Sequence, residues 1–160
     1  MEQILEILEQ NCRISPEQIA TMLDTTPENV EEAIRKIEKD NVILGYRALI
    51  NWEKTMKESV NAFIEVRITP QQGEGYDKIA RDINKFDMVK SVYLMSGGYD
   101  LAVIIEGKTL KEVAMFVSQK LATMDLVQST KTHFVLKKYK DAGVIFKENS
   151  DDDERRVITL

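Results

Sequence analysis

A short glycine turn followed by a carboxylate carries the clearest potential for binding chemistry in this chain of 160 residues. Gly97 and Gly98 precede Tyr99 and Asp100, and an apolar run begins at Leu101. Glycine lets a ligand approach backbone N–H groups closely. These donors suit an anionic group, and the side chain of Asp100 could accept a hydrogen bond from a cationic one, so the turn is a candidate ligand site. The alternative, given equal weight, is that Asp100 forms hydrogen bonds only within its own hairpin.

Two helix starts of the same design lie eleven residues apart near the N-terminus. Ser15 and Thr26 are hydroxyl N-caps, and each is followed by a proline and a glutamate. The hydroxyl accepts from first-turn N–H groups, and proline is well tolerated at the first helical position. Ser15 and Gln18 also have the spacing of a capping box. About four residues, Met22–Thr25, separate the helices, which is typical of a helix-turn-helix but also occurs in ordinary bundles.

The second helix of this pair offers the candidate contacts to DNA. They are the polar and basic residues Thr26, Asn29, Arg35, Lys36 and Lys39. Glu31 and Arg35 are four residues apart, as are Glu32 and Lys36, and this acid-before-base order also stabilises a helix by itself. Residues 1–58 carry 7 Lys and Arg against 12 Asp and Glu. Because DNA phosphates repel this excess of negative charge, we expect modest DNA affinity.

Three apolar stripes predict the helical core that must hold these residues. The first helix is expected at about 2–11, and the other two follow the two N-caps. The stripes consist of Ile4, Leu5, Ile7 and Leu8, then Ile19, Ala20 and Leu23, then Val30, Ala33, Ile34 and Ile37. Residues 42–50 are expected to be extended with a break at Gly45, and residues 51–59 to form a polar linker.

The glycine turn belongs to a second pattern, in which apolar alternation and helical spacing follow each other. Strands are expected at 60–68, 89–96, 101–106 and 127–138, helical stripes at 76–86 and 110–121, and a loop at 70–75. The order βαββαβ is the ferredoxin-like arrangement. Both helices should cover one sheet face, and the other face, with Asn61, Phe63, Glu65 and Arg67 of the first strand, is a candidate dimer surface.

The last residues, 139–160, are expected to form a tail. Its acidic block Asp151–Glu154 is interpreted as a solvated hinge. The final residues Val157–Leu160 either add a strand to a neighbouring sheet or remain disordered.

Composition argues against several other classes of protein. No apolar run is long enough to span a membrane, and the acidic start Met1–Gln3 does not fit a secretory signal. Cys12 is the only cysteine, which suits a reducing cytoplasm. His133 is the only histidine and has no partners at metal-ligand spacing, and Gly73-x-Gly75 is not a dinucleotide fingerprint. We expect no enzyme activity, no metal and no cofactor.

Taken together, four motifs resemble one family of bacterial and archaeal regulators. They are Arg13-Ile14-Ser15, the helix pattern that ends in Ile37-Glu38, the segment Val42–Tyr46, and Gly97–Leu101. With the order of the two domains, they are similar to the Lrp/AsnC family, also called leucine-responsive or feast/famine proteins. The similarity covers residues 1 to about 138.

The resemblance implies an α+β protein with an N-terminal winged-type helix-turn-helix and a C-terminal ferredoxin-like domain. It implies a DNA-binding domain at 1–42, an extended linker at 43–58, an effector and oligomerisation domain at 59–138, and a tail at 139–160. The expected partners are double-stranded DNA, an amino acid or related metabolite, and further copies of the chain in dimers that assemble to octamers. The expected effector site lies at a contact between dimers and comprises Met95, Ser96, Gly97, Gly98, Tyr99, Asp100, Leu101, Leu126, Gln128 and Ser129.

The sequence differs from the family in the recognition helix, where relatives commonly have arginines at the positions of Glu32 and Ala33. We expect a single dimer to bind DNA weakly, with higher assembly raising avidity. A regulator that responds to an amino acid is favoured. The alternatives are a DNA-organising protein with little effector control, and a small-molecule sensor with weak DNA binding.

Overall fold

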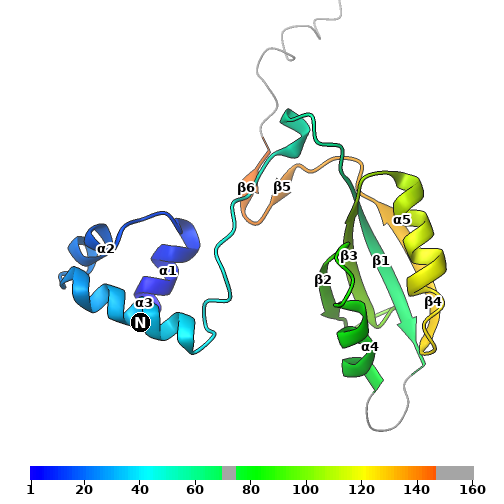
Figure 1. The fold of residues 1–160 in the computed structure, drawn as a ribbon, viewed down its shortest axis with the longest axis horizontal. Coiled ribbons are helices and arrows are strands. Elements are labelled where there is room, and N and C mark those ends of the chain that lie inside the picture. Colours follow the sequence, from blue (N-terminus) through cyan, green and yellow to red (C-terminus); the bar gives the residue numbers. More distant parts are fainter. Residues whose placement is uncertain (70–74, 147–160) are drawn as a thin grey trace, which may run out of the picture. The chain divides into compact units, whose positions relative to one another are not determined.

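The computed structural model describes residues 1–69 and 75–146 of the chain. The chain divides into two compact units, Met1–Leu49 and Ile50–Leu160. The first unit is helical, and the second combines a sheet with helices (Figure 1). Among the described residues, no helix has the length and apolar character needed to cross a bilayer.

The first unit contains α1 (Glu2–Gln10), α2 (Pro16–Leu23) and α3 (Pro27–Lys39). The predicted capping box is confirmed, because the Gln18 N–H donates to the Ser15 hydroxyl and the Ser15 N–H donates to the Gln18 side chain. A left-handed residue, Asp24, ends α2 at φ 51° and allows the sharp turn into α3.

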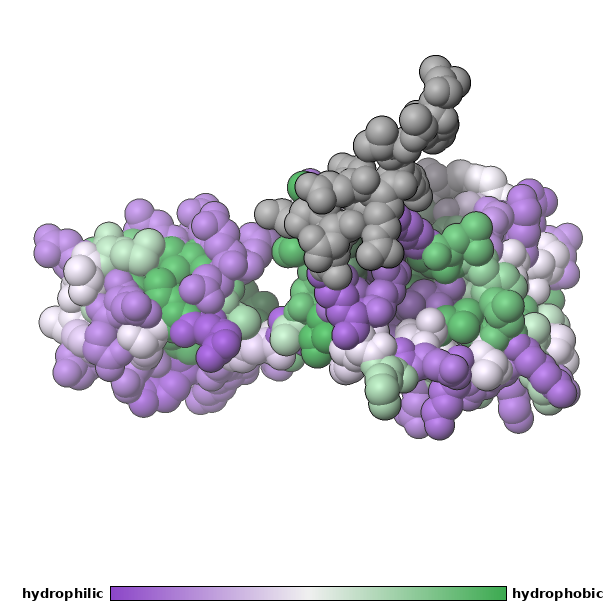
Figure 2. Space-filling view, turned by 90° about the horizontal axis from the view of Figure 1, so that it is seen from above, coloured by the Kyte–Doolittle hydropathy of each residue, from purple (hydrophilic) through white to green (hydrophobic). Residues whose placement is uncertain are grey.

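A single apolar core holds the three helices in place. Its buried residues come from all three predicted stripes and comprise Ile4, Leu8, Ile19, Ala20, Val30 and Ile37. In the space-filling view the visible surface of this unit is mostly hydrophilic, with a band of hydrophobic residues across it (Figure 2). After α3 the chain folds back, and the Tyr46 hydroxyl donates to Glu38 at 3.0 Å. Partial burial, followed by the Glu38 carboxylate, raises the pKa of the Tyr46 phenol.

The second unit begins with a 3-10 turn, η1 (Trp52–Lys54). The strands β1 (Val60–Ile68), β2 (Val89–Leu94), β3 (Leu101–Gly107) and β4 (Val127–Phe134) form one antiparallel sheet in the order β2-β3-β1-β4. Helix α4 (Gly75–Ile83) lies between β1 and β2 in the sequence, and α5 (Leu110–Phe116) lies between β3 and β4. This confirms the predicted ferredoxin-like fold.

Both helices cover the same sheet face, as predicted. Alternate residues of β1 pack with Ile79 and Ile83 of α4 and with Val113 and Phe116 of α5 in one core. A π-helical turn, η2 (Val117–Leu121), extends α5 and keeps Val117 and Leu121 in this core. Of the predicted stripe at 110–121, Val113, Val117 and Leu121 are buried, whereas Leu110 and Ala114 are exposed. The backbone of this segment changes from α to π geometry.

The opposite face of the sheet is open in the single chain. Phe63 lies 6.0 Å from Tyr99 and 5.9 Å from His133 between ring centroids, and the His133 imidazole lies 2.9 Å from Glu65. Asn61, Phe63 and Glu65 are half-buried and Arg67 is exposed, in the alternation that was predicted for this face.

Three predictions about the strands and the tail were inexact. Strand β2 ends at Leu94 rather than at 96, because a longer turn connects it to β3. Strand β4 ends at Phe134, which pairs with Ala62, rather than at 138, and one further hydrogen bond runs from the Val135 N–H to the Asn61 carbonyl at 2.9 Å. The first part of the tail is a hairpin of β5 (Lys140–Asp141) and β6 (Val144–Ile145). The predictions for residues 70–74 and 147–160 lie outside the described residues.

Candidate functional site

The predicted effector residues converge at one end of the sheet, because the glycine turn and the start of β4 both flank the end of β1. Val66 of β1 pairs with Leu101 of β3 on one side and with Thr130 of β4 on the other. Two consecutive residues at the end of β1 bond to the glycine turn and to the segment before β4. Ile68 N–H donates to the Asp100 carboxylate, and Thr69 N–H donates to the Leu126 carbonyl at 3.0 Å.

Asp100 is the most connected residue of this end. Its Oδ2 accepts from the Ile68 N–H at 2.8 Å, and its Oδ1 accepts from the Tyr76 hydroxyl of α4 at 3.4 Å. Its own N–H donates to the Val66 carbonyl at 3.0 Å. The pairing of β1 with β4 shifts in register between Arg67 and Ile68, so Asp100 satisfies the N–H directly after this irregularity.

These contacts give Asp100 a structural role, but its side chain bonds to β1 and α4 and not, as the alternative prediction had it, within its own hairpin. An ionised carboxylate offers about four lone-pair sites, so two internal hydrogen bonds leave it able to accept from an ammonium group as well. Tyr76 was assigned to the apolar stripe alone, because a hydroxyl at a core position gives no sequence signal of its partner. The structure adds it to the site as the residue that joins α4 to Asp100.

The remaining candidate residues differ in how far their side chains are exposed to solvent. Met95, Ser96, Gly97 and Gly98 are exposed, whereas Tyr99 is half-buried against Phe63. Leu101 is only 1% exposed and its side chain belongs to the core, so only its backbone is available. On the β4 side, Leu126 is half-buried, and Gln128 and Ser129 are exposed.

The two glycines leave open space at the turn. A Cβ atom built on Gly97 or Gly98 would meet no other atom of the chain within 4 Å. The turn closes with a hydrogen bond from the Met95 N–H to the Asp100 carbonyl at 2.8 Å, so it is longer than a two-residue hairpin loop. The backbone at Gly98 is therefore accessible to a ligand or a second chain.

A cavity of about 610 Å³ lies between α4 and the segment that leads into β4. Ile79, Phe86, Met124 and Leu126 supply apolar lining, and acidic and basic side chains also line it. One basic residue is Lys85, whose ammonium lies 2.6 Å from the Asp82 carboxylate. Because Leu126 also bonds to Thr69, this cavity adjoins the end of the sheet that holds Asp100.

In the helical unit, two of the five candidate DNA contacts serve the start of α3. Thr26 is the N-cap and accepts from the Asn29 N–H at 3.4 Å, and the Asn29 amide donates to Thr25 at the same distance. Both residues are exposed. Their side chains are therefore partly occupied within the helix, as the predicted cap required.

The three basic candidates are all exposed on α3. The Arg35 guanidinium lies 3.5 Å from the Glu31 carboxylate, which is the predicted helical pair. Within residues 1–69 and 75–146, Lys36 and Lys39 form no ion pair, so the second predicted pair, with Glu32, is not made. Of the three basic candidates, Lys36 and Lys39 are therefore more available to a phosphate than Arg35.

The residues considered for catalysis do not form a reactive group. His133 is placed on the open sheet face beside Glu65 and Phe63, and Cys12 is exposed in the helical unit. In the part of the chain that the structure describes, no group of three His, Cys, Asp or Glu side chains is arranged to hold a metal ion.

Two family models match the chain. The ligand-binding domain of Lrp/AsnC matches residues 61–145, and a winged helix-turn-helix DNA-binding domain matches residues 2–43. An HTH-type transcriptional regulator of Bacillus subtilis (strain 168), YugG, is 49% identical over 158 residues, which covers 98% of this chain and 95% of the relative. A second one, from Pyrococcus abyssi, is 31% identical over 88% of this chain and 92% of its own.

Solved structures share the fold. A transcriptional regulator from Neisseria meningitidis in complex with L-Met aligns with a TM-score of 0.70 and 23% identity, over 87% of this chain and 89% of its own. The feast or famine regulatory protein of M. tuberculosis complexed with L-methionine has a TM-score of 0.71 and 19% identity, with 88% and 92% of the two chains covered.

Proposed function

The chain belongs to the Lrp/AsnC family of transcriptional regulators, with a DNA-binding helix-turn-helix and a ligand-binding domain, and we propose that an amino acid is its effector. Binding of the amino acid, or of a related small metabolite, changes the oligomeric state of the protein or its affinity for double-stranded DNA. Each predicted domain has one role. Residues 1–42 bind DNA, residues 59–138 bind the effector, and residues 43–58 form the linker between them. The protein acts in the cytoplasm.

The observation that carries this proposal is the accessible turn beside a partly occupied carboxylate. Gly98 exposes backbone to an incoming carboxylate, and Asp100 keeps lone pairs for an ammonium group. The two groups of an α-amino acid would therefore find complementary partners within one turn. Met95, Ser96, Leu126, Gln128 and Ser129 surround the same sheet end and would contact the effector side chain. Two regulators with this fold were solved with methionine, which supports an amino acid as ligand.

Assembly of several copies fits the exposed surfaces. Phe63, Tyr99 and His133 present aromatic rings on the open sheet face, and burying such a face against a second copy is favourable. The effector turn lies at the end of that sheet, where further dimers would meet in an octamer. An effector bound between dimers can shift assembly only by binding the assembled and free states unequally.

A sensor with weak DNA binding is the second candidate. The acidic first unit and the pairing of Arg35 with Glu31 favour it, because they leave few free cations on α3. Several linked helix-turn-helix units would offset this weakness through avidity. The two candidates differ in the affinity of the assembled protein for its upstream DNA.

A thermal melt in the presence of single amino acids tests the effector proposal. A ligand that binds only the native state raises the melting temperature with concentration, by mass action. Gly98→Ala is the matched variant, because its methyl group meets nothing in the chain and should block only a ligand or a second copy at the turn. A panel of amino acids that shifts neither the melt nor the size of the assembly would contradict the proposal.

A further inference from the structure

The only histidine of the chain is paired with a carboxylate on the open sheet face. His133 of β4 and Glu65 of β1 both lie on this face, and the His133 Nε2 is 2.9 Å from a Glu65 carboxylate oxygen. In the single chain 43% of the His133 side chain and 27% of the Glu65 side chain are exposed. The pair therefore meets solvent when the chain is alone and loses it when another chain covers the face.

The strand register shows which other charged side chains lie beside this pair. Lys131 of β4 is directly opposite Glu65, and Arg67 follows Glu65 on the same side of β1. Within residues 1–69 and 75–146, Lys131 and Arg67 form no ion pair, and His133 is the one hydrogen-bonding partner of the Glu65 carboxylate. Tyr99 also contacts the Phe63 ring, but phenols stay neutral at the pH values at which histidine titrates.

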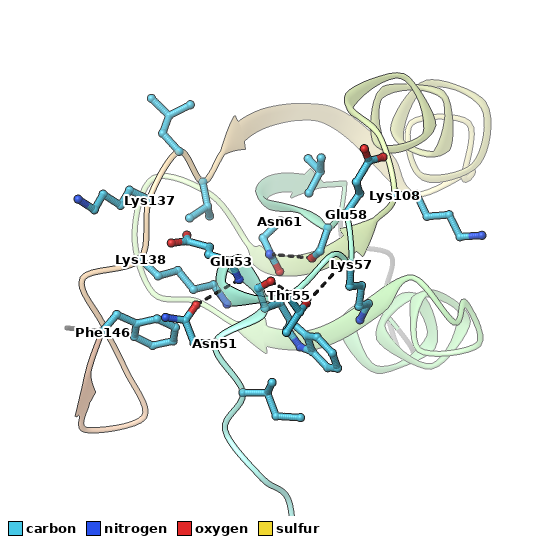
Figure 3. A pocket seen from close by; sticks show the side chains of 16 residues that line it. Asn51, Glu53, Thr55, Lys57, Glu58, Asn61, Lys108, Lys137, Lys138 and Phe146 are labelled. Atoms are coloured by element: carbon cyan, nitrogen blue, oxygen red, sulfur yellow. Dashed lines mark hydrogen bonds between the residues drawn. The ribbon is translucent and has the colours of Figure 1, made fainter. Parts of the chain in front are cut away.

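Further charged groups lie toward the end of the sheet opposite the glycine turn. Glu106 of β3 is on the open face there and lies 3.0 Å from the Lys57 ammonium. A cavity of about 460 Å³ at this end is lined by both acidic and basic side chains. In its close-up, Lys138 reaches inward, while Lys108 and Lys137 extend outward on opposite sides (Figure 3). Carboxylates and ammonium groups do not ordinarily titrate between about pH 6 and pH 8, so we expect these charges to stay constant in that range.

Covering the open face with a second copy changes the cost of the Glu65 charge. A carboxylate that loses its water is costly unless a cation or several hydrogen bonds compensate for it. A neutral imidazole offers Glu65 one hydrogen bond, whereas an imidazolium also neutralises the charge. Histidine is the side chain that ordinarily changes its charge between about pH 5 and pH 8. The cost of burying this pair should therefore depend on pH.

We propose that assembly through the open sheet face is linked to protonation of His133, so that the dimer is favoured when His133 and Glu65 form a charged pair. This inference rests on the proposed assembly through the same face. By linkage, a proton and a second copy each raise the affinity of the chain for the other. Association therefore strengthens as the pH falls through the range in which histidine titrates. Because each copy contributes one pair, a gain of about threefold for each pair gives a roughly tenfold change in the dimer Kd.

Sedimentation equilibrium of the full-length protein at about pH 6 and about pH 8, at one ionic strength, tests this linkage. The wild type should dimerise roughly tenfold more tightly at the lower pH. His133→Gln can still donate an N–H to Glu65 but cannot be protonated, so its dimer Kd should be the same at both pH values. Glu65→Gln leaves an imidazolium without a carboxylate, so its dimer should become weaker at the lower pH. If the dimer does not dissociate on dilution, the urea concentration that dissociates it is compared in the same way.

The matched control is Lys131→Gln, which removes an exposed cation from the same strand and face but retains the pair. It should keep the pH dependence of the wild type. A wild-type dimer with the same Kd at both pH values would overturn the proposal, as would a pH dependence that persists in His133→Gln. A wild type that stays monomeric at both pH values would contradict the assembly through this face, and the linkage with it.

Discussion

The contacts of Asp100 predict different outcomes for two substitutions of the same residue. Asp100→Ala leaves the N–H of Ile68 without an acceptor, and Ile68 is only 4% exposed, so water does not replace the carboxylate readily. Hydrogen bonds to a charged group contribute about 1.5–3 kcal/mol. At roughly 4 °C per kcal/mol for a domain of this size, the melting temperature should fall by about 6–12 °C. Asp100→Asn retains an oxygen acceptor and should melt close to the wild type.

The two variants also separate stability from ligand binding. Asp100→Asn lacks the charge that would attract an ammonium group, so the melting shift caused by the effector should be lost although the fold persists. Asp87→Ala serves as the control, since it removes an exposed carboxylate that makes no side-chain hydrogen bond among the described residues. Calorimetry of the free and ligand-saturated proteins measures both quantities. If Asp100→Ala melts like the wild type, the structural role assigned to Asp100 is wrong.

Three further predictions follow from the other surfaces. Glu32→Arg on α3 should tighten DNA binding and steepen the dependence of log K on log salt by about 0.9, whereas the control Glu6→Arg on α1 should not. Equal slopes of the two variants in an anisotropy titration would show that α3 does not face DNA. Phe63→Glu should weaken dimerisation in sedimentation equilibrium, because it places a charge on the open sheet face, while Met115→Glu on α5 should not. An unchanged dimer of Phe63→Glu would show that the open sheet face is not the dimer interface. The lowered pKa of Glu106 implies stability that is present above pH 4.5, its ordinary value, and is lost as the pH falls below it. Lys57→Met should therefore make the stability less dependent on pH in that range. Identical acid-unfolding profiles of the wild type and Lys57→Met would contradict the Lys57–Glu106 ion pair.

Patterns within one segment were sufficient to predict the five α-helices and the four strands of the main sheet in the described part of the chain. The Ser15 and Thr26 caps were predicted from hydroxyl, proline and glutamate at fixed offsets, because a cap is a local interaction. The alternation from Val60 to Ile68 likewise predicted both the strand and its two faces. These features depend on neighbours in the sequence, so one chain is enough to recognise them.

Features that depend on distant partners were not predictable in this way. The extent of β4 depends on its pairing with β1, which is distant in the sequence. The hairpin after Tyr139 turns through Ala142 at φ 43°, a conformation that is uncommon for alanine and has no signal in the sequence. The hydrogen bonds of Asp100 to Ile68 and Tyr76 join residues 32 and 24 positions apart. Sequence alone could therefore propose binding or a hydrogen bond within the hairpin for Asp100 without finding its partners on β1 and α4.

Coupling between the two domains is the central claim, and one titration tests it most directly. Anisotropy of labelled DNA from the region upstream of the gene would be measured with and without a saturating amino acid that shifts the melt, for the wild type and for Gly98→Ala. Linkage requires that an effector which changes DNA affinity is itself bound with altered affinity in the presence of DNA. We expect the amino acid to change the DNA affinity of the wild type severalfold and to leave Gly98→Ala unchanged. Identical DNA binding curves for the wild type with and without the amino acid would contradict effector control of DNA binding.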